Sequence, residues 1–187
     1  MVYPIVAYGH PTLKKVAKEI KSDYKDLNVL IEDMFETMYE SVGVGLAAPQ
    51  INKSIRLFIV DADPYKEEHP ETEGFKKIFI NPYITSETGE EWEFKESCLS
   101  IPHIAEYVSR NNKLKIEYFD EEFNFHEEDY DGILARIIQH EYDHLEGILF
   151  VDKINPLSKM LIRRKLSDIK TGKVKTSYRM IFPGKKK

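Results

Sequence analysis

The chain has 187 residues and a formal net charge of −5, with 42% hydrophobic and 32% charged residues. This length allows one globular domain whose core is large enough to fold without disulfides or a structural metal. The composition is that of an ordinary soluble protein, and no apolar run approaches the roughly 18–20 residues that span a bilayer. Because the N-terminus also lacks the basic and apolar segments of a signal peptide, we expect a cytoplasmic protein.

Two helices are predicted before residue 45. The first covers residues 12–20, with Thr12 near its N-cap. The second runs from residue 22 or 23 to Ser41, because apolar residues recur there at three- and four-residue spacing and form one face. Gly43 and Gly45 are expected to end it.

The middle of the chain predicts β-structure, since several segments alternate apolar and polar residues as half-buried antiparallel strands do. The predicted strands cover residues 55–61, 77–84, 90–95, 105–110 and 113–119. Residues 61–74 are acidic and rich in turn formers, which indicates a surface loop. Residues 121–131 are similarly acidic, and no strand is assigned to them.

Two helices are predicted after the strands. One covers residues 133–146, with Gly147 as the residue that follows its C-terminus, and the last covers residues 156–169. The order of helix, strands and helix indicates an α+β fold and not alternating βαβ units.

The most informative segment is His140-Glu141-Tyr142-Asp143-His144, inside the predicted helix 133–146. Residues four apart lie on one helix face, so the two imidazoles can hold one metal ion. Glu141 can then take a proton from a water that the metal activates. The alternative is a surface helix that carries two histidines by chance. However, the apolar residues before His140 indicate a buried face, where histidines need partners.

A catalytic metal needs a third ligand, and no histidine follows Gly147. Asp152 is the nearest acid downstream of the helix. Upstream, Cys98 precedes a Pro-containing turn, although a lone cysteine is most often a small buried hydrophobic residue. Two rival functions stay open here: a zinc endopeptidase, which needs a downstream ligand, and a structural metal site, for which His103 is the only spare histidine near Cys98.

Residues 43–50 (GVGLAAPQ) follow the second predicted helix. Glycines let the backbone approach a ligand closely, and the Gln50 amide offers a hydrogen-bond donor. The alternative is a helix end followed by the start of a buried strand.

Three segments together resemble the peptide deformylase family, which carries GxGLAAxQ, EGCLS and QHExDHLxG in this order. They are residues 43–50 (GVGLAAPQ), 96–100 (ESCLS) and 139–147 (QHEYDHLEG). With residues 4–6 and 10–13, the resemblance spans roughly the first 150 residues. It implies antiparallel β-sheets packed around a central helix that carries the HExxH motif, with an N-terminal and a C-terminal helix.

The resemblance also implies an activity, the hydrolysis of the N-formyl group from the N-terminal formylmethionine of new polypeptides, with release of formate. The implied metal is one Fe²⁺ per chain, which Zn²⁺ or Ni²⁺ replaces in preparations; the ligand types alone would indicate zinc. The implied metal ligands are Cys98, His140 and His144.

The same resemblance implies that Glu141 is the general base and that the Leu99 backbone N–H and the Gln50 side chain stabilise the oxyanion. Gly45 and the adjacent backbone would bind the peptide as an added strand, and Arg136 is expected at the pocket rim. The apolar residues expected to form the methionine pocket, each equally compatible with the core, are Val44, Leu99, Ile133 and Ile137.

One residue departs from the family pattern, because Ser97 stands where the family has glycine. If that position needs a positive φ, serine carries a strain of about 1 kcal/mol. Opposite charges on adjacent predicted strands also suggest that Glu96 pairs with Arg110 behind the metal ligands.

The charge is distributed unevenly, with twelve Lys and Arg but only one acidic residue, Asp168, from Lys153 to the end. This excess predicts an anionic partner, unless it is only a solvated helix and chain end. Because the implied substrate emerges from the ribosome, we expect contact with ribosomal RNA, and neither DNA nor a membrane as a partner. We expect one catalytic domain over residues 1–187, with a basic helix and tail from about residue 153. The basic residues expected to contact ribosomal RNA are Lys159, Arg163, Arg164 and Lys165.

Overall fold

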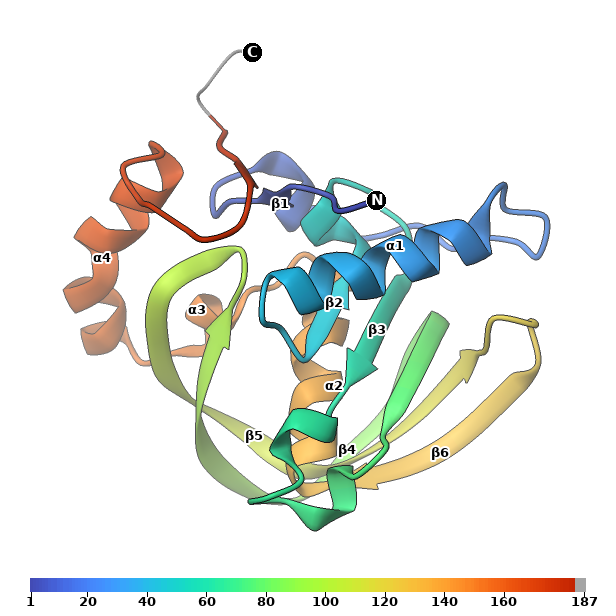
Figure 1. The fold of residues 1–187 in the computed structure, drawn as a ribbon. Coiled ribbons are helices and arrows are strands. Elements are labelled where there is room, and N and C mark those ends of the chain that lie inside the picture. The colour runs from blue at the N-terminus through green and yellow to red at the C-terminus, as the bar shows by residue number, and fades with distance from the viewer. Residues whose placement is uncertain (184–187) are drawn as a thin grey trace.

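The computed structural model describes residues 1–183, so the last lysines of the basic tail, Lys185 to Lys187, lie outside the described residues. Five antiparallel strands form one sheet in the order β2-β3-β4-β5-β6 (Figure 1). Their bounds are Gly45–Ala47, Leu57–Asp61, Lys76–Cys98, Ile101–Phe119 and Phe125–Asp131. A separate parallel pair joins β1 (Ile5–Val6) to β7 (Met180–Ile181), near the two ends of the chain.

The helices are α1, α2, α3 and α4, and together with the antiparallel sheet they make the expected α+β fold (Figure 1). Their bounds are Leu27–Glu40, Gly132–Leu145, Phe150–Lys153 and Pro156–Lys170. No helix within residues 1–183 is both long and apolar enough to cross a membrane.

The long strands β4 and β5 bend around α2 (Figure 1). Shifts in their pairing register occur between Thr88 and Glu91 and again between Ser97 and Cys98. Such bulges bend and twist a strand. The paired strands β4 and β5 can therefore extend from β3 to the side of α2. The sequence predicted four strands here, because polar residues at the bends interrupt the alternation.

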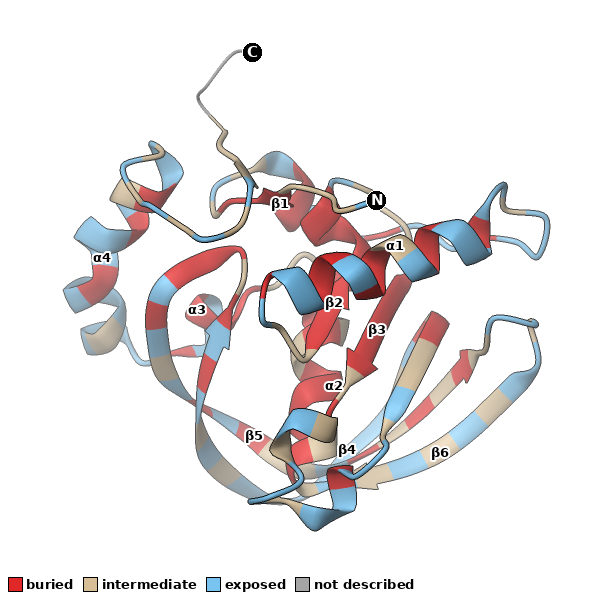
Figure 2. Cartoon of the chain, viewed as in Figure 1, coloured by how far each residue is buried: buried red, intermediate tan, exposed pale blue. Residues whose placement is uncertain are grey.

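The helix α2 crosses the middle of the fold and is largely buried (Figure 2). It lies where the sequence predicted, and Gly147 follows its end with a φ of 71°. A Cβ atom on Gly147 would lie 2.8 Å from the carbonyl carbon of Lys14. Glycine therefore allows both the left-handed turn and the close packing of the N-terminal segment against the end of α2.

The predicted helix over residues 12–20 is wrong. Only the 3-10 helix η1 (Pro11–Lys14) forms, with the His10 ring accepting a hydrogen bond from the Thr12 N–H. The chain then runs extended: the Ala17 N–H donates to the Leu145 carbonyl at 2.7 Å, and Lys18 bridges Ile55. The spacing of buried Leu13, Ala17 and Ile20 resembles that of a helix, but the backbone groups are satisfied by other segments.

The other helices agree better with the sequence. α1 buries the predicted apolar face except for Tyr39, which is 46% exposed, and it begins four or five residues late because Asp26 adopts a left-handed φ of 57°. α4 is confirmed, and the Asn155 side chain caps its N-terminus by accepting a hydrogen bond from the Ser158 N–H.

The acidic stretches differ from each other. Residues 61–74 form a mostly exposed surface loop with two 3-10 turns, η3 (Asp63–Tyr65) and η4 (Pro70–Thr72). Residues 125–131, by contrast, form the edge strand β6, which the sequence analysis missed. Its acids pair with lysines of the sheet, as Glu127 does with Lys115 at 2.8 Å. Charged side chains on an edge strand oppose pairing with another chain.

Candidate active site

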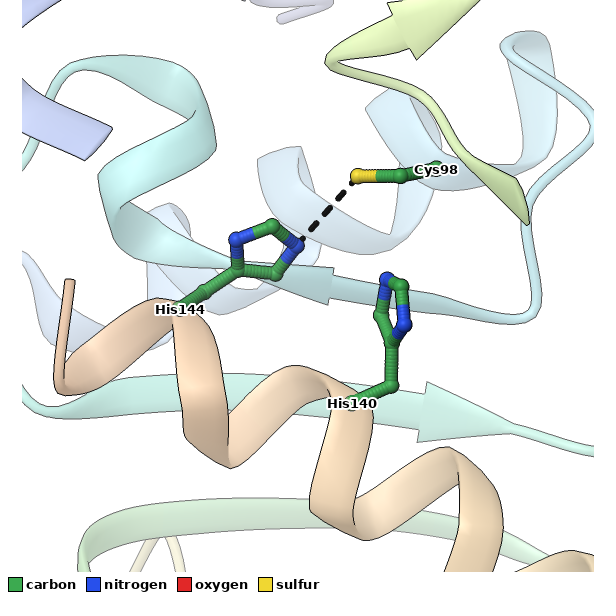
Figure 3. Close-up of side chains that lie close together, drawn as sticks. All are labelled: Cys98, His140 and His144. Atoms are coloured by element: carbon green, nitrogen blue, oxygen red, sulfur yellow. Dashed lines mark hydrogen bonds between the residues drawn. The ribbon is translucent and has the colours of Figure 1, made fainter. Parts of the chain in front are cut away.

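The three predicted metal ligands lie together. His140 and His144 project from one face of α2, one turn apart, and Cys98 reaches them from the end of β4 (Figure 3). The Cys98 Sγ atom is 3.3 Å from His144 Nε2. One ligand atom from each of the three residues can be chosen so that all lie within 4.8 Å of one another. Cys98 and His144 are buried, and His140 is nearly so.

The ring of His140 is oriented by Glu96. His140 Nδ1 is 2.8 Å from Glu96 Oε2, which leaves Nε2 for a ligand. Glu96 also accepts hydrogen bonds from Arg110 at 2.7 and 3.0 Å and from Arg136 at 2.9 Å. Burial alone would raise the pKa of Glu96, but His140 and Arg110 hold it well below its ordinary value. This carboxylate is therefore charged and fixed in place.

The predicted pair of Glu96 and Arg110 is confirmed as a contact, and it belongs to a larger buried network. Arg110 also donates to Asp143 at 2.6 Å, and Asp143 contacts Lys153 at 2.9 Å. Asp143 belongs to the motif on α2, so the network ties this helix to β4 and β5. The sequence did not indicate these contacts, because Arg110 lies 33 residues before Asp143 and Lys153 belongs to a different helix, α3.

Glu141 follows His140 on α2 and lies beside the cluster. Its Oε2 atom is buried without a hydrogen-bond partner among the described residues. Burial raises the pKa of Glu141 to about 7, although the nearby His140 acts in the opposite direction. A Cβ atom on Gly45 would lie 2.5 Å from Glu141 Oε1. Gly45 therefore makes room for this carboxylate, a role that its sequence context did not indicate.

The two predicted oxyanion donors lie near Cys98. Gln50 Oε1 accepts a hydrogen bond from the Ala47 N–H at 2.8 Å, which turns the amide nitrogen toward the cluster. That nitrogen lies 3.5 Å from Cys98 Sγ and 3.4 Å from Ser100 Oγ. Leu99 occupies the turn between β4 and β5, directly after Cys98. Residues 45–47 form the buried strand β2, so the segment 43–50 is both a strand start and a wall of the site.

A cavity of about 470 Å³ opens beside the cluster. Arg136 lines it, is only 2% exposed and donates a hydrogen bond to Glu96. The cavity is also lined by Tyr65 from the 61–74 loop and by residues 176–178 of the tail, neither of which the sequence analysis included. The predicted substrate and oxyanion residues that line it are Val44, Gly45, Gln50, Leu99, Ile133, Arg136 and Ile137.

Ser97 replaces the family glycine without the strain that a positive φ would bring. It is not among the described residues with positive φ, and it pairs with Ala105 in the ladder between β4 and β5. Its side chain is exposed beside the cavity. The position therefore accepts serine in ordinary strand geometry.

The donor atoms fit a divalent metal, since a thiol and two imidazoles suit zinc and iron. Burial would lower the pKa of His140, but Cys98 and Glu96 raise it well above its ordinary value, whereas burial and the nearby His140 lower the pKa of His144. Among the described residues no fourth side chain joins the group. The spare histidine, His103, is exposed, and its Nε2 lies 2.7 Å from the Lys175 carbonyl oxygen. Three protein ligands leave a position for water, as catalytic sites do.

A Cys/His/His cluster, a glutamate with one buried unpaired oxygen on the same helix and an adjoining cavity are typical of hydrolases with an HExxH metal site. The comparisons with known proteins are more specific. The family model of polypeptide deformylase matches residues 2–160. A peptide deformylase of Flavobacterium psychrophilum is 53% identical over the whole of both chains.

Solved structures agree with this. The crystal structure of a peptide deformylase from Legionella pneumophila has a TM-score of 0.80 and 38% identity, and covers 92% of this chain and 98% of its own. A class I type b peptide deformylase from Acinetobacter baumannii has a TM-score of 0.75 and 34% identity, and covers 82% of this chain and 99% of its own. The chain belongs to the peptide deformylase family.

Proposed function

We propose that this enzyme removes the N-formyl group from the formylmethionine of new polypeptides and releases formate. The observation that carries the proposal is the carboxylate of Glu141, whose buried Oε2 has no partner among the described residues, beside the Cys98, His140 and His144 cluster and a cavity with apolar walls. The Acinetobacter baumannii relative has been crystallised bound to Met-Ala-Ser, a peptide that begins with methionine. We further propose that residues 1–187 act as one catalytic domain.

In this proposal, Cys98, His140 and His144 hold one Fe²⁺ ion. When bound, such an ion lowers the pKa of a water molecule and polarises a carbonyl oxygen. Glu96 keeps the His140 ring in the orientation that leaves Nε2 free for binding. The thiol and imidazole donors by themselves suit zinc equally well, so the choice of iron rests on the family resemblance.

Glu141 moves the proton. Its carboxylate accepts a proton from the attacking water, the water oxygen adds to the formyl carbon, and the C–N bond breaks. The proton then passes from Glu141 to the leaving amine, so the products are formate and a peptide with a free amino group. A carboxyl group whose pKa lies near neutrality can both accept and return a proton, and burial supplies that shift here.

The oxygen of the formyl group gains negative charge during this addition. The Gln50 amide nitrogen is directed at the cluster by the hydrogen bond that its oxygen accepts from Ala47. We assign it and the Leu99 backbone N–H as donors to that oxygen. Such preorganised donors are each worth about 3–4 kcal/mol in other hydrolases.

Substrate binding uses the cavity and the edge of the sheet. Val44, Ile133 and Ile137 supply apolar walls that suit a methionine side chain. β2 pairs with β3 on one side and ends the described sheet on the other, so its backbone is available to bind a peptide as an added strand. Gly45, within β2, brings this backbone close to Glu141.

The decisive experiment measures formate release from a formyl-Met peptide by the iron-loaded protein without oxygen, because thiolate-bound ferrous iron is oxygen-sensitive. We expect release from formyl-Met, none from acetyl-Met and no cleavage of internal peptide bonds. Absence of formate from the iron-loaded protein would refute the proposal, and internal cleavage would favour an endopeptidase. Parallel zinc- and nickel-loaded samples test the choice of metal.

We also propose that α4 contacts ribosomal RNA while the enzyme acts on new chains in the cytoplasm. Exposed cations on α4 support this, since phosphate contacts by Lys and Arg give salt-dependent binding. We expect a charge-reversed α4 to lose cosedimentation with ribosomes at low salt, and a control reversed elsewhere to keep it. Equal sedimentation of both would contradict the proposal. The reversed residues are Lys159, Arg163, Arg164 and Lys165 in the variant, and Lys18, Lys21, Lys25 and Lys113 in the control.

A further inference from the structure

The C-terminal segment after α4 returns to the active site. Residues 173–183 follow the part of the chain that the family model matches, which ends at residue 160. Nevertheless Thr176, Ser177 and Tyr178 line the same cavity as Glu141. The Acinetobacter baumannii relative covers 82% of this chain with nearly all of its own length, so part of this chain has no counterpart there. The tail therefore lies outside the segment that the family model matches, but it borders the same cavity.

Several contacts fix the tail in this position. β7 pairs with β1, and the N–H groups of Ile5 and Ala7 donate to the carbonyls of Arg179 and Ile181 at 2.9 and 2.8 Å. Before the cavity-lining residues 176–178, the Lys175 carbonyl oxygen lies 2.7 Å from His103 Nε2. The segment between these anchors therefore has little freedom to leave the cavity.

The tail reaches the turn that carries Leu99. The Tyr178 hydroxyl donates a hydrogen bond to the Leu99 carbonyl at 2.8 Å. The next carbonyl, that of Ser100, accepts a hydrogen bond from the Tyr8 N–H, also at 2.8 Å. Both chain ends, joined through β1 and β7, thus hold consecutive peptide groups of one turn.

Burial raises the pKa of Tyr178, and the nearby Cys98 acts in the same direction. A tyrosine hydroxyl is protonated at neutral pH even at its ordinary pKa, so this hydroxyl remains a donor. Its ring packs against the core cluster that contains Leu46 and Met38, with Leu99 beside it. The ring packs against the core, whereas the hydroxyl orients the Leu99 carbonyl. Removing the hydroxyl alone can therefore separate these two contributions.

We propose that Tyr178 is a positioning residue for the reaction, acting through Leu99. By fixing the peptide group between Leu99 and Ser100, it restricts rotation about Leu99 and so the direction of the Leu99 N–H. This inference rests on the proposed function, in which that N–H faces the charged oxygen. A donor that is misdirected in the free enzyme must be reoriented during reaction, which lowers the rate more than it weakens substrate binding.

The test is Tyr178→Phe, which removes the hydroxyl and keeps the ring, with Tyr107→Phe as control because Tyr107 is 59% exposed on β5. With formyl-Met peptide and iron, we expect kcat of Tyr178→Phe to fall about 10- to 100-fold. KM should change less than about twofold, and metal content should not change. Tyr107→Phe should behave as the parent.

A second measurement follows the turn itself. In ¹⁵N-labelled, zinc-loaded protein, the amide of Leu99 should exchange faster with solvent in Tyr178→Phe, while amides of α2 should not. Unchanged kcat and unchanged exchange would overturn the inference and leave deformylation intact. A rise in KM alone would also overturn it, because the tail would then only contact substrate. If the parent protein releases no formate, the proposed function fails, whereas the exchange result still reports on the turn.

Discussion

The two sides of the Cys98, His140 and His144 cluster are built differently. Behind His140, the buried charges of Glu96 and Arg110 are each satisfied by several hydrogen bonds. Toward the cavity, Glu141 has a buried oxygen without a partner among the described residues. One side has its charges fixed, and the other keeps a carboxylate available.

The two sides therefore suit different roles: Glu96 orients a metal ligand, and Glu141 takes part in the reaction. A buried charge with complete hydrogen bonds keeps its protonation state and its position, as a residue that orients a metal ligand must. A base needs an available lone pair, and leaving one buried costs free energy. Substitutions on the paired side should therefore affect folding and metal binding, whereas those on the open side should affect turnover.

The largest effect is expected on the open side. Glu141→Gln keeps the shape but removes the group that accepts and returns the proton, and such groups contribute typically 10²–10⁴-fold to rates. We expect kcat for formate release to fall by about that factor, with metal content and thermal midpoint close to those of the parent. The measurement combines a formate assay with elemental analysis of the same sample. Loss of metal in this variant would show that the two sides are not separable.

On the paired side, around Glu96, we expect substitutions to change stability and metal affinity. Glu96→Gln leaves Arg136 and His140 without their charged partner, and breaking a buried pair costs about 3–5 kcal/mol. We expect a lower free energy of unfolding in urea and metal affinity weaker by about 10- to 100-fold. Glu93→Gln on the exposed face of the same strand is the control and should change stability by less than about 0.5 kcal/mol. Equal stability of both variants would contradict this account of Glu96.

A third change tests the space around Glu141. Gly45→Ala adds a Cβ atom within 2.5 Å of the present position of Glu141 Oε1, so the carboxylate must move. We expect kcat to fall about 10- to 100-fold, because a misplaced base transfers protons poorly, while metal content is retained. An increase in KM without loss of kcat would instead assign Gly45 to peptide binding alone.

The sequence predicted the centre of this site better than its borders. Cys98, His140 and His144 lie together as predicted, because the helical spacing of the two histidines and the ordered motifs constrain their chemistry locally. The helix predicted over residues 12–20 failed because backbone groups of Ala17 and Lys18 bond to Leu145 at the end of α2 and to residues 54–56, and not to groups within a helical turn of their own. Nothing near Tyr178 in the sequence indicates that it reaches Leu99, since 79 residues separate the two.

The smallest predicted effect concerns the exposed ion pair between Lys14 and Asp152. Burial would raise the pKa of Asp152, but Lys14 and the Leu149 N–H lower it. A lowered pKa stabilises the fold above the ordinary value of 3.8, and this contribution is lost as the pH falls through the folded-state pKa. Because both side chains are at least one-third exposed, we expect Lys14→Met to cost less than about 1 kcal/mol in urea at pH 7.

At pH 3, below the ordinary value of 3.8, that difference should be smaller, because the unfolded chain protonates Asp152 there and the parent loses part of the stabilisation that the pair provides. Lys159→Met is the matched control, since Lys159 lies farther from Asp152, at 3.7 Å, and should matter less. A difference between Lys14→Met and the parent that is equal at both pH values would mean that Lys14 acts through packing. A cost of several kcal/mol would place this pair with the buried network of Glu96, and the distinction between surface and buried pairs in this region would not hold.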